Sequence, residues 1–197
     1  MAQARVLADR VIPGEGLAWD VLRLAAANVL LVLCARLAIP LPWTPVPITG
    51  QTFGVMLVAV LLGPTRAAMA LCLYLVEGFL GLPVFQPFGA PGAARFAGPT
   101  AGYLLSYPLA AFVTGWLVET RRFGNAYAST VPLVGSLLAG QSLVFFGGCA
   151  WLAVVMQMGW SAAFTAGVAP FLAGEAVKIA AVVAAARSLH IVTRSEA

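Results

Sequence analysis

Charged residues are scarce in this chain. Lys, Arg, Asp and Glu together make up 9% of its 197 residues, whereas a soluble domain carries about 25%. Hydrophobic residues account for 61%, which leaves too few polar side chains to cover a water-facing surface. A domain of this size cannot place so much apolar material in its interior. These proportions exclude a soluble globular domain and predict an all-α integral membrane protein.

Metal sites and covalent catalysis also lack their usual residues. The cysteines Cys34, Cys72 and Cys149 lie in separate apolar runs without CxxC spacing, and the single histidine, His190, has no ligand-like partners. The sequence contains no Ser/His/Asp set, HExxH motif or Walker lysine, and no basic cluster that would bind nucleic acid. We therefore expect no catalytic residue, no metal, no cofactor and no nucleic-acid partner. If transport uses ATP, a partner subunit hydrolyses it.

Six apolar stretches are suited to crossing a membrane. A span needs roughly 20 apolar residues to cross about 30 Å of hydrocarbon. The second stretch, at about 15 residues, is short by this standard. Prolines, glycines or charged residues separate the stretches, which cover 21–39, 48–63, 65–82, 99–118, 131–156 and 162–188. The sequence therefore predicts a bundle of six transmembrane helices, with the substrate-binding domain over 21–189.

Basic residues fall mainly on one side of this predicted bundle. With six spans, the N-terminus, the 2–3 turn, the 4–5 loop and the C-terminus lie on the same side of the membrane. The arginines on this side are Arg5, Arg10, Arg23, Arg66, Arg121, Arg122, Arg187 and Arg194. Since Lys and Arg are in excess in cytoplasmic loops, both termini are expected in the cytoplasm. Residues 1–20, which lack the apolar core of a secretory signal, form a cytoplasmic arm, and 190–197 a cytoplasmic tail.

Three ionisable residues lie in the apolar spans away from this side. Glu175 and Lys178 are three residues apart, so they share one helix face, and charges in a membrane are retained mostly where they pair or meet a ligand. Either they neutralise each other, or Lys178 binds a polar ligand as a cation while Glu175 accepts from N–H groups. Glu77, with Tyr74 one turn earlier, either lines the same pocket or contacts a neighbouring helix.

Two connections on the opposite side contain candidate pocket residues. Arg95 lies in the Gly/Pro-rich connection 84–98, where it either reaches the membrane interface or folds over a carboxylate. The 40–52 loop has four prolines in eight residues, which stiffen an extended chain. This loop is either an inert connector with Trp43 as an interface anchor, or a lid with Trp43 or Gln51 facing the pocket.

Five motifs follow one another along the chain: PVPITGQT at 45–52, LGP at 62–64, GLPVF at 81–85, GPTAGY at 98–103 and GExxK at 174–178. Together they cover most of the chain from about residue 40 to 178. In this order they resemble the motifs of the BioY family, the biotin-binding S components of energy-coupling factor (ECF) transporters. The resemblance implies a six-helix membrane bundle that holds biotin near the outer face, beneath the 1–2 loop. It also implies a multi-pass protein of the cytoplasmic membrane.

The resemblance also implies roles for particular residues. The last motif of the family usually reads Gly-Asp-x-x-Lys and contributes an acid and a lysine to the pocket; the matching residues here are Glu175 and Lys178, so that Glu replaces Asp. Arg95 falls in the connection from which the family supplies a basic contact. Gln86, which follows the GLPVF motif, is a further polar contact.

A transmembrane coupling subunit and two ABC ATPase subunits are the partners that the resemblance implies. In S components, small residues of the first helix mediate docking to the coupling subunit, because they let another helix approach closely. Two such patches occur here: the spaced pair Cys34 and Ala38, and the run Ala25, Ala26 and Ala27.

Three alternatives remain at this point. The chain could be an S component for another vitamin, or a solitary biotin transporter in which a homo-oligomer replaces the coupling subunits. It could also be a structural membrane protein whose buried charges only pair with one another.

Overall fold

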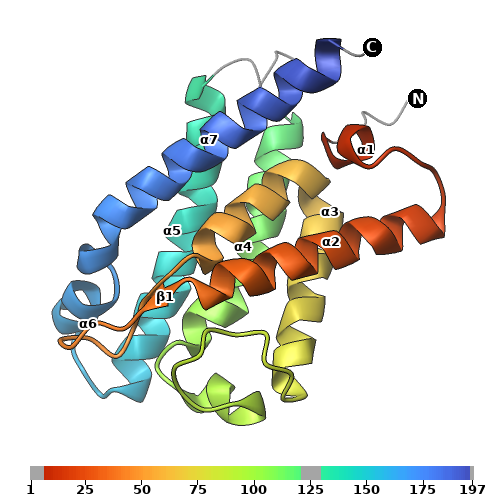
Figure 1. The fold of residues 1–197 in the computed structure, drawn as a ribbon. Coiled ribbons are helices and arrows are strands. Elements are labelled where there is room, and N and C mark those ends of the chain that lie inside the picture. Colours follow the sequence, from red (N-terminus) through yellow and green to blue (C-terminus); the bar gives the residue numbers. More distant parts are fainter. Residues whose placement is uncertain (1–6, 121–129, 196–197) are drawn as a thin grey trace.

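The fold is described for residues 7–120 and 130–195 in a computed structural model, except for the side chains of residues 10 and 190–195 (Figure 1). The predicted 4–5 loop with Arg121 and Arg122, and the side chains of the predicted tail, lie outside the described residues. The elements in order are α1 (Leu7–Val11), α2 (Leu17–Arg36), β1 (Ala38–Ile39), β2 (Ile48–Thr49), α3 (Gln51–Phe79), η1 (Gly92–Ala97), α4 (Ala101–Thr120), α5 (Thr130–Val155), α6 (Trp160–Gly167), η3 (Ala169–Phe171) and α7 (Leu172–Ser195).

Five helical stretches of the described chain are long and apolar enough to cross a membrane: Leu17–Arg36, Gln51–Phe79, Ala101–Thr120, Thr130–Val155 and Trp160–Leu189. The protein is therefore a multi-pass membrane protein. Helix α4 packs against both α3 and α5, and α7 crosses over α3 and α5 (Figure 1). The described ends of the chain, α1 and the end of α7, lie at the same end of the bundle, and η1 lies at the other (Figure 1).

Helix α3 contains both the second and the third predicted spans, joined at a sharp bend. Gly63 has a non-helical backbone (φ 75°, ψ −178°), and Pro64 follows it inside the helix. Glycine adopts this positive φ without steric cost, and proline has no N–H to continue the helical hydrogen bonds. A Cβ on Gly115 of α4 would come within 2.6 Å of the Pro64 nitrogen. The bend is therefore a close-packed contact, and it lies where the sequence predicted a boundary.

The sixth predicted span is also interrupted. Helix α6 ends at Gly167, η3 contains Pro170, and α7 starts at Leu172. Val168 has a non-helical backbone at the break (φ −127°, ψ −57°), and Pro170 has no N–H to continue the helical hydrogen bonds of α6. As a result Glu175 lies in the first turn of α7, at the end of the helix dipole that favours a negative charge.

The first two spans are joined by a small β-hairpin, an addition to the predicted all-α fold. Residues of β1 pair antiparallel with those of β2, with Ala38 opposite Thr49 and Ile39 opposite Ile48. The four prolines lie between the strands, where the absence of their N–H groups breaks no ladder bond. The hairpin therefore folds the proline-rich loop back toward α3.

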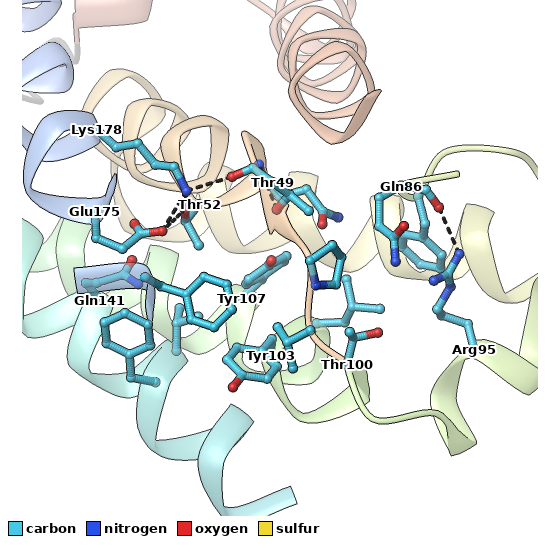
Figure 2. Close-up of a pocket in the computed structure, with 18 residues that line it drawn as sticks. Thr49, Thr52, Gln86, Arg95, Thr100, Tyr103, Tyr107, Gln141, Glu175 and Lys178 are labelled. Carbon is cyan, nitrogen blue, oxygen red and sulfur yellow. Dashed lines mark hydrogen bonds and ion pairs between the residues drawn. The ribbon is translucent and has the colours of Figure 1, made fainter. Parts of the chain in front are cut away.

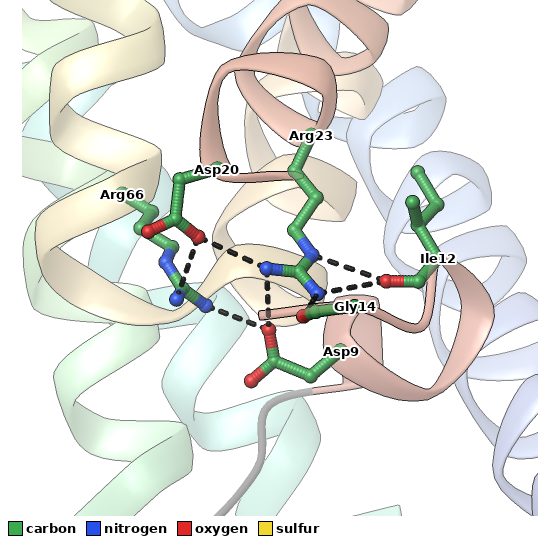
Figure 3. A network of polar contacts seen from close by, with 6 residues as sticks. All are labelled: Asp9, Ile12, Gly14, Asp20, Arg23 and Arg66. Atoms are coloured by element: carbon green, nitrogen blue, oxygen red, sulfur yellow. Dashed lines mark hydrogen bonds and ion pairs between the residues drawn. The ribbon is translucent and has the colours of Figure 1, made fainter. Parts of the chain in front are cut away.

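Arg23 of α2 connects the N-terminal segment to the bundle (Figure 3). It is 3% exposed, and it donates hydrogen bonds to the carbonyl oxygens of Ile12 (2.8 and 3.3 Å) and Gly14 (2.8 Å). Its Nη1 lies 2.9 Å from Asp20 Oδ1 and 3.3 Å from Asp9 Oδ1. The turn between α1 and α2 is thus closed around one buried guanidinium.

Arg66, just after the bend in α3, contacts the same two carboxylates (Figure 3). Its Nη1 lies 2.8 Å from Asp9 Oδ1 and its Nη2 2.8 Å from Asp20 Oδ1. Arg23 and Arg66, which the charge distribution predicts on one side of the membrane, therefore meet in one network. This network joins α1, α2 and α3.

We expect Arg23→Met to destabilise the protein, because two carbonyls and two carboxylates lose a charged donor. The free energy of unfolding should fall by about 2 kcal/mol, which corresponds to roughly 4 to 8 °C in the midpoint of thermal unfolding in detergent. Arg187→Met is the matched control, since Arg187 is exposed and, among the described residues, its hydrogen bond is to the Thr130 hydroxyl. Equal midpoints for the two variants would contradict the structural role of Arg23.

Candidate ligand-binding site

A cavity of about 570 Å³, counted with the space open to solvent, lies between the β-hairpin, α3, α4, α5 and α7 (Figure 2). Its walls are mostly apolar and aromatic, and the aromatic residues are Phe85, Tyr103, Tyr107, Phe145 and Phe171. Polar groups gather at its two ends: Glu175 and Lys178 at one, Gln86 and Arg95 at the other (Figure 2). Concave, largely apolar sites with a few placed polar groups are typical of small-molecule binding.

Lys178 is held by contacts to three groups. Its Nζ donates to Glu175 Oε1 (2.6 Å), to the Thr49 carbonyl oxygen (2.6 Å) and to Thr52 Oγ1 (2.8 Å). The Thr52 hydroxyl in turn donates to Glu175 Oε1 (2.8 Å). An ammonium has three N–H donors, so each donor of Lys178 is matched by a protein acceptor. These bonds fasten α7 to β2 and to the start of α3.

Glu175, by contrast, is only half satisfied. The residue is 5% exposed, and its Oε2 is buried without a hydrogen-bond partner in the described part of the chain. A buried carboxylate oxygen without a partner is costly. The pair therefore neutralises its charge, as one of the two interpretations of the sequence predicts. It also leaves one acceptor at the cavity for an N–H group, as the other predicts.

Tyr74 lies behind the cavity wall and supports two residues that form it. Its hydroxyl accepts from Gln51 Nε2 (2.8 Å) and donates to the Val84 carbonyl oxygen (3.1 Å). Its ring meets Phe85 edge-on, with 5.1 Å between centroids. Tyr74 is fully buried, whereas Gln51 and Phe85 line the cavity. The predicted ligand contact at Tyr74 is thus, in the structure, a support for Gln51.

Arg95 is a buried cation that lacks a carboxylate partner. Arg95 is 7% exposed. Its Nη2 donates to the Gln86 carbonyl oxygen (2.9 Å), and its Nη1 donates to the Phe88 carbonyl oxygen. The guanidinium also lies 5.9 Å from the centre of the Phe85 ring. Its Nε has no hydrogen-bond partner among the described residues. The carboxylates of the described residues all lie outside ion-pair distance of the Arg95 guanidinium. Burial lowers the pKa of Arg95 because it disfavours the charged form.

A second cavity of about 510 Å³ adjoins the first on the side of the loops. It is covered by the proline-rich loop and by the segment between Phe88 and Pro99. The residues that line both cavities are Pro47, Gln86, Arg95 and Thr100. Arg95 therefore stands in the wall between an outer and an inner space, and Gln86 lies beside it with its Oε1 accepting from the Phe88 N–H (2.6 Å).

The proline-rich loop covers the cavity, but Trp43 does not face it. Val46 and Pro47 line the cavity, whereas Trp43 is 69% exposed. The Thr44 hydroxyl donates to the Ala166 carbonyl oxygen (2.8 Å) and fastens the loop to α6. Trp43 lies in the turn at residues 42–43, and its side chain is exposed beside the buried Thr44.

Glu77, like Tyr74 and Trp43, is a predicted contact that does not line the cavity. Helix α3 ends at Phe79, before the predicted end of the third span at residue 82, so Glu77 lies in the last turn. It is half-buried there and is not among the residues that line either cavity. Of the two interpretations of the sequence, the structure therefore does not support the one in which Glu77 lines the pocket.

Several cavity residues were missed by the sequence analysis. Thr49 and Thr52 belong to the PVPITGQT motif, but their pairing with Lys178 joins residues more than a hundred positions apart. Gln141 lines the cavity from the middle of α5. A lone amide in a 26-residue apolar helix is a signal that could have identified it, because polar residues inside membranes are usually functional.

The predicted docking patches on α2 are only partly accessible. Cys34 is 5% exposed and packs against the first arm of α3, and Ala38 lies in β1, beyond the helix end at Arg36. The spaced pair Cys34 and Ala38 therefore does not form a helical surface, which corrects that prediction. Of the alanine run, Ala27 is buried, whereas Ala25 and Ala26 are exposed.

Removing the Thr52 hydroxyl tests the polar cluster without any ligand. Thr52→Val keeps the shape of the side chain but removes one acceptor from Lys178 and one donor from Glu175. We expect the free energy of unfolding to fall by about 1 to 2 kcal/mol, measured as a lower midpoint of thermal unfolding in detergent. The control is Thr165→Val, because the exposed Thr165 donates to the Ser161 carbonyl oxygen of its own helix. An unchanged midpoint for Thr52→Val would count against the cluster.

Comparison with known proteins gives a consistent result. The model of the BioY family matches residues 7–195. A biotin transporter BioY of Rhizobium etli is 40% identical over 151 residues, covering 75% of this chain and 78% of that protein. A probable biotin transporter BioY of Pyrococcus horikoshii is 36% identical over 146 residues, covering 74% and 82%.

A solved structure shares the fold. The crystal structure of the S-component for biotin from an ECF-type ABC transporter superposes with a TM-score of 0.78 at 25% identity, covering 90% of this chain and 95% of that one. The family model extends over nearly the whole described chain, and relatives above 30% identity agree with it. The chain belongs to the BioY family.

Proposed function

We propose that the chain captures biotin with high affinity at the outer face of the cytoplasmic membrane, and that it mediates uptake as the substrate-specificity subunit of an ECF-type ABC importer. One observation carries the proposal. An aromatic-walled cavity has a cation without a carboxylate partner at one end, Arg95, and an unpaired carboxylate oxygen at the other, Glu175. The names of the relatives and of the matched structure support it.

The chemistry of biotin fits the two ends of the cavity. Biotin has a carboxylate at one end of an alkyl chain and a cyclic urea with two N–H donors at the other. Arg95 would bind the carboxylate, since guanidinium–carboxylate pairs are strong and directional. Glu175 Oε2 would accept from a ureido N–H, and Lys178 would hold Glu175 in place. Gln51 would contact the ligand from the cavity wall.

The second cavity supports entry of the ligand from the loop side. Arg95 and Gln86 line both spaces, so a carboxylate arriving in the outer space would meet the guanidinium before the ligand reaches Glu175. The loop with Val46 and Pro47 would close over the bound ligand, as a lid.

Six spans with both termini in the cytoplasm are part of the same proposal. The bend at Gly63 divides α3 into two arms, which would be the second and the third span. The network of Arg23 and Arg66 includes Asp9 of α1 (Figure 3), and α1 lies with the end of α7 at the end of the bundle opposite η1 (Figure 1). An excess of arginine at this end supports its cytoplasmic location.

The partners would be a transmembrane coupling subunit and two ABC ATPases. No residue of the described chain forms a recognisable hydrolytic site, and the relatives are transporters by name, so the energy would come from those partners. The exposed Ala25 and Ala26 of α2 form the small-residue surface that remains for close approach of a coupling helix.

Arg95 can be tested by pairing a variant with a ligand analogue. Arg95→Met should weaken biotin binding roughly 10- to 100-fold, measured by equilibrium binding of labelled biotin to the purified chain in detergent. The unchanged chain should bind biotin methyl ester more weakly than biotin by a similar factor. The Arg95→Met variant should bind biotin and its methyl ester with nearly equal affinity, because the partner of the carboxylate is already absent.

Arg36→Met is the control for this pair of measurements, since Arg36 is exposed, donates to the Pro83 carbonyl oxygen and lines neither cavity. If esterification of biotin lowers the affinity equally for the unchanged chain and for Arg95→Met, the carboxylate binds somewhere other than at Arg95. Absence of saturable biotin binding, with binding of another vitamin, would favour an S component of different specificity.

Uptake distinguishes the subunit from a solitary transporter. We expect cells that express the chain to accumulate labelled biotin only when a coupling subunit and its ATPases are also expressed, because the sequence contains no Walker lysine for ATP hydrolysis. The comparison is made in a host without biotin uptake, with equal amounts of the chain in the membrane. Accumulation by the chain alone would instead support a homo-oligomeric transporter.

A further inference from the structure

Gln141 is a buried amide for which the described part of the chain provides no partner. It lies in the middle of α5 and is 4% exposed, and neither Nε2 nor Oε1 has a hydrogen-bond partner. No other side chain of the described residues leaves both a donor and an acceptor buried in this way. Ser136 and Ser142 of the same helix bond back to carbonyls one turn earlier. The unpaired state of Gln141 is thus particular to this residue.

The amide lies at the cavity, beside the other unpaired group. Gln141 and Glu175 both line the cavity, on the side opposite Arg95 (Figure 2). Glu175 contributes an oxygen, Oε2, that is also buried and unpaired. Helix α5 thus contributes one donor group, Gln141 Nε2, and one acceptor, Gln141 Oε1. Helix α7 contributes a second acceptor, Glu175 Oε2, at the same end of the cavity.

Glu175 alone cannot satisfy Gln141. A carboxylate oxygen only accepts hydrogen bonds, so a rotation of Gln141 toward Glu175 would pair Nε2 but leave Oε1 without a donor. Nor can Lys178 supply the missing donor, because its three N–H groups are bound to Thr49, Thr52 and Glu175. A molecule that offers both donors and an acceptor would satisfy the whole set.

We propose that Gln141 recognises the cyclic urea of the ligand. Gln141 Oε1 accepts from one ureido N–H, Gln141 Nε2 donates to the ureido carbonyl, and Glu175 Oε2 accepts from the second N–H. A carboxamide and one edge of a cyclic urea each present a donor beside an acceptor, so they pair through two parallel hydrogen bonds. Gln141 is thus a specificity-determining residue that selects ring ureas, and this role rests on the proposed binding of biotin.

The selectivity follows from the cost of leaving Gln141 unpaired. A site built to pair buried polar groups rejects an analogue that lacks the matching groups. Lipoate has the same carboxyl-terminated chain as biotin but a ring without a urea. Desthiobiotin keeps the urea and lacks the sulfur. The site should therefore favour biotin and desthiobiotin over lipoate, and Gln141 should account for much of that preference.

Gln141→Leu is the direct test, with competition binding of biotin, desthiobiotin and lipoate to the purified chain in detergent. We expect biotin and desthiobiotin to bind roughly 10- to 100-fold more weakly, because two hydrogen bonds are lost. Lipoate should bind with unchanged or higher affinity, since no amide must be left unpaired. The midpoint of thermal unfolding without ligand should stay the same or rise.

Asn28→Leu is the matched control, because Asn28 Nδ2 is also buried and unpaired but the residue lines neither cavity. It should leave all three affinities unchanged. If Gln141→Leu does not fold, Gln141→Met, which is unbranched and adaptable, serves in its place. Biotin binding equal to that of the unchanged chain, or a parallel loss for lipoate, would overturn the role of Gln141. Failure of the unchanged chain to bind biotin would instead overturn the proposed function.

Discussion

The structure depends on how one ammonium group is accommodated in an apolar bundle. A charge inside a membrane-spanning bundle is tolerated only where it is paired and fully hydrogen-bonded. Lys178 meets that requirement with Glu175, Thr52 and the Thr49 carbonyl oxygen, which come from α7, α3 and β2. The same bonds set the position of the hairpin over the cavity. They also use up one oxygen of Glu175 and direct the other to the ligand space.

Two sets of charged groups in the protein differ in how completely they are paired. Arg23 and Arg66 share two aspartates at the end of the bundle that holds the termini, where they close a structural network. Arg95 and the second oxygen of Glu175 are buried but incompletely paired. Unpaired buried polar groups reduce stability, so those retained at a cavity indicate a ligand that completes them. The helix breaks at Gly63 and Pro170 shape the bundle around that cavity.

Local signals in the sequence predicted much of this arrangement. Apolar segments located the helices, the Gly63-Pro64 pair located the bend, and helical spacing placed Glu175 and Lys178 on one face. Contacts between distant segments were not predictable in this way. The hairpin, the outward turn of Trp43 and the burial of Cys34 against α3 depend on how the elements pack. Composition and periodicity within one helix contain no information about its neighbours.

A structure of the chain with biotin bound tests the account most directly, because it fixes the orientation of the ligand. The account predicts the carboxylate within about 2.7 to 3.2 Å of a guanidinium nitrogen of Arg95. It predicts the ureido ring between Glu175 and Gln141, with hydrogen bonds to both. Biotin in the reverse orientation, with its carboxylate at Lys178 and its ring at Arg95, would contradict the account.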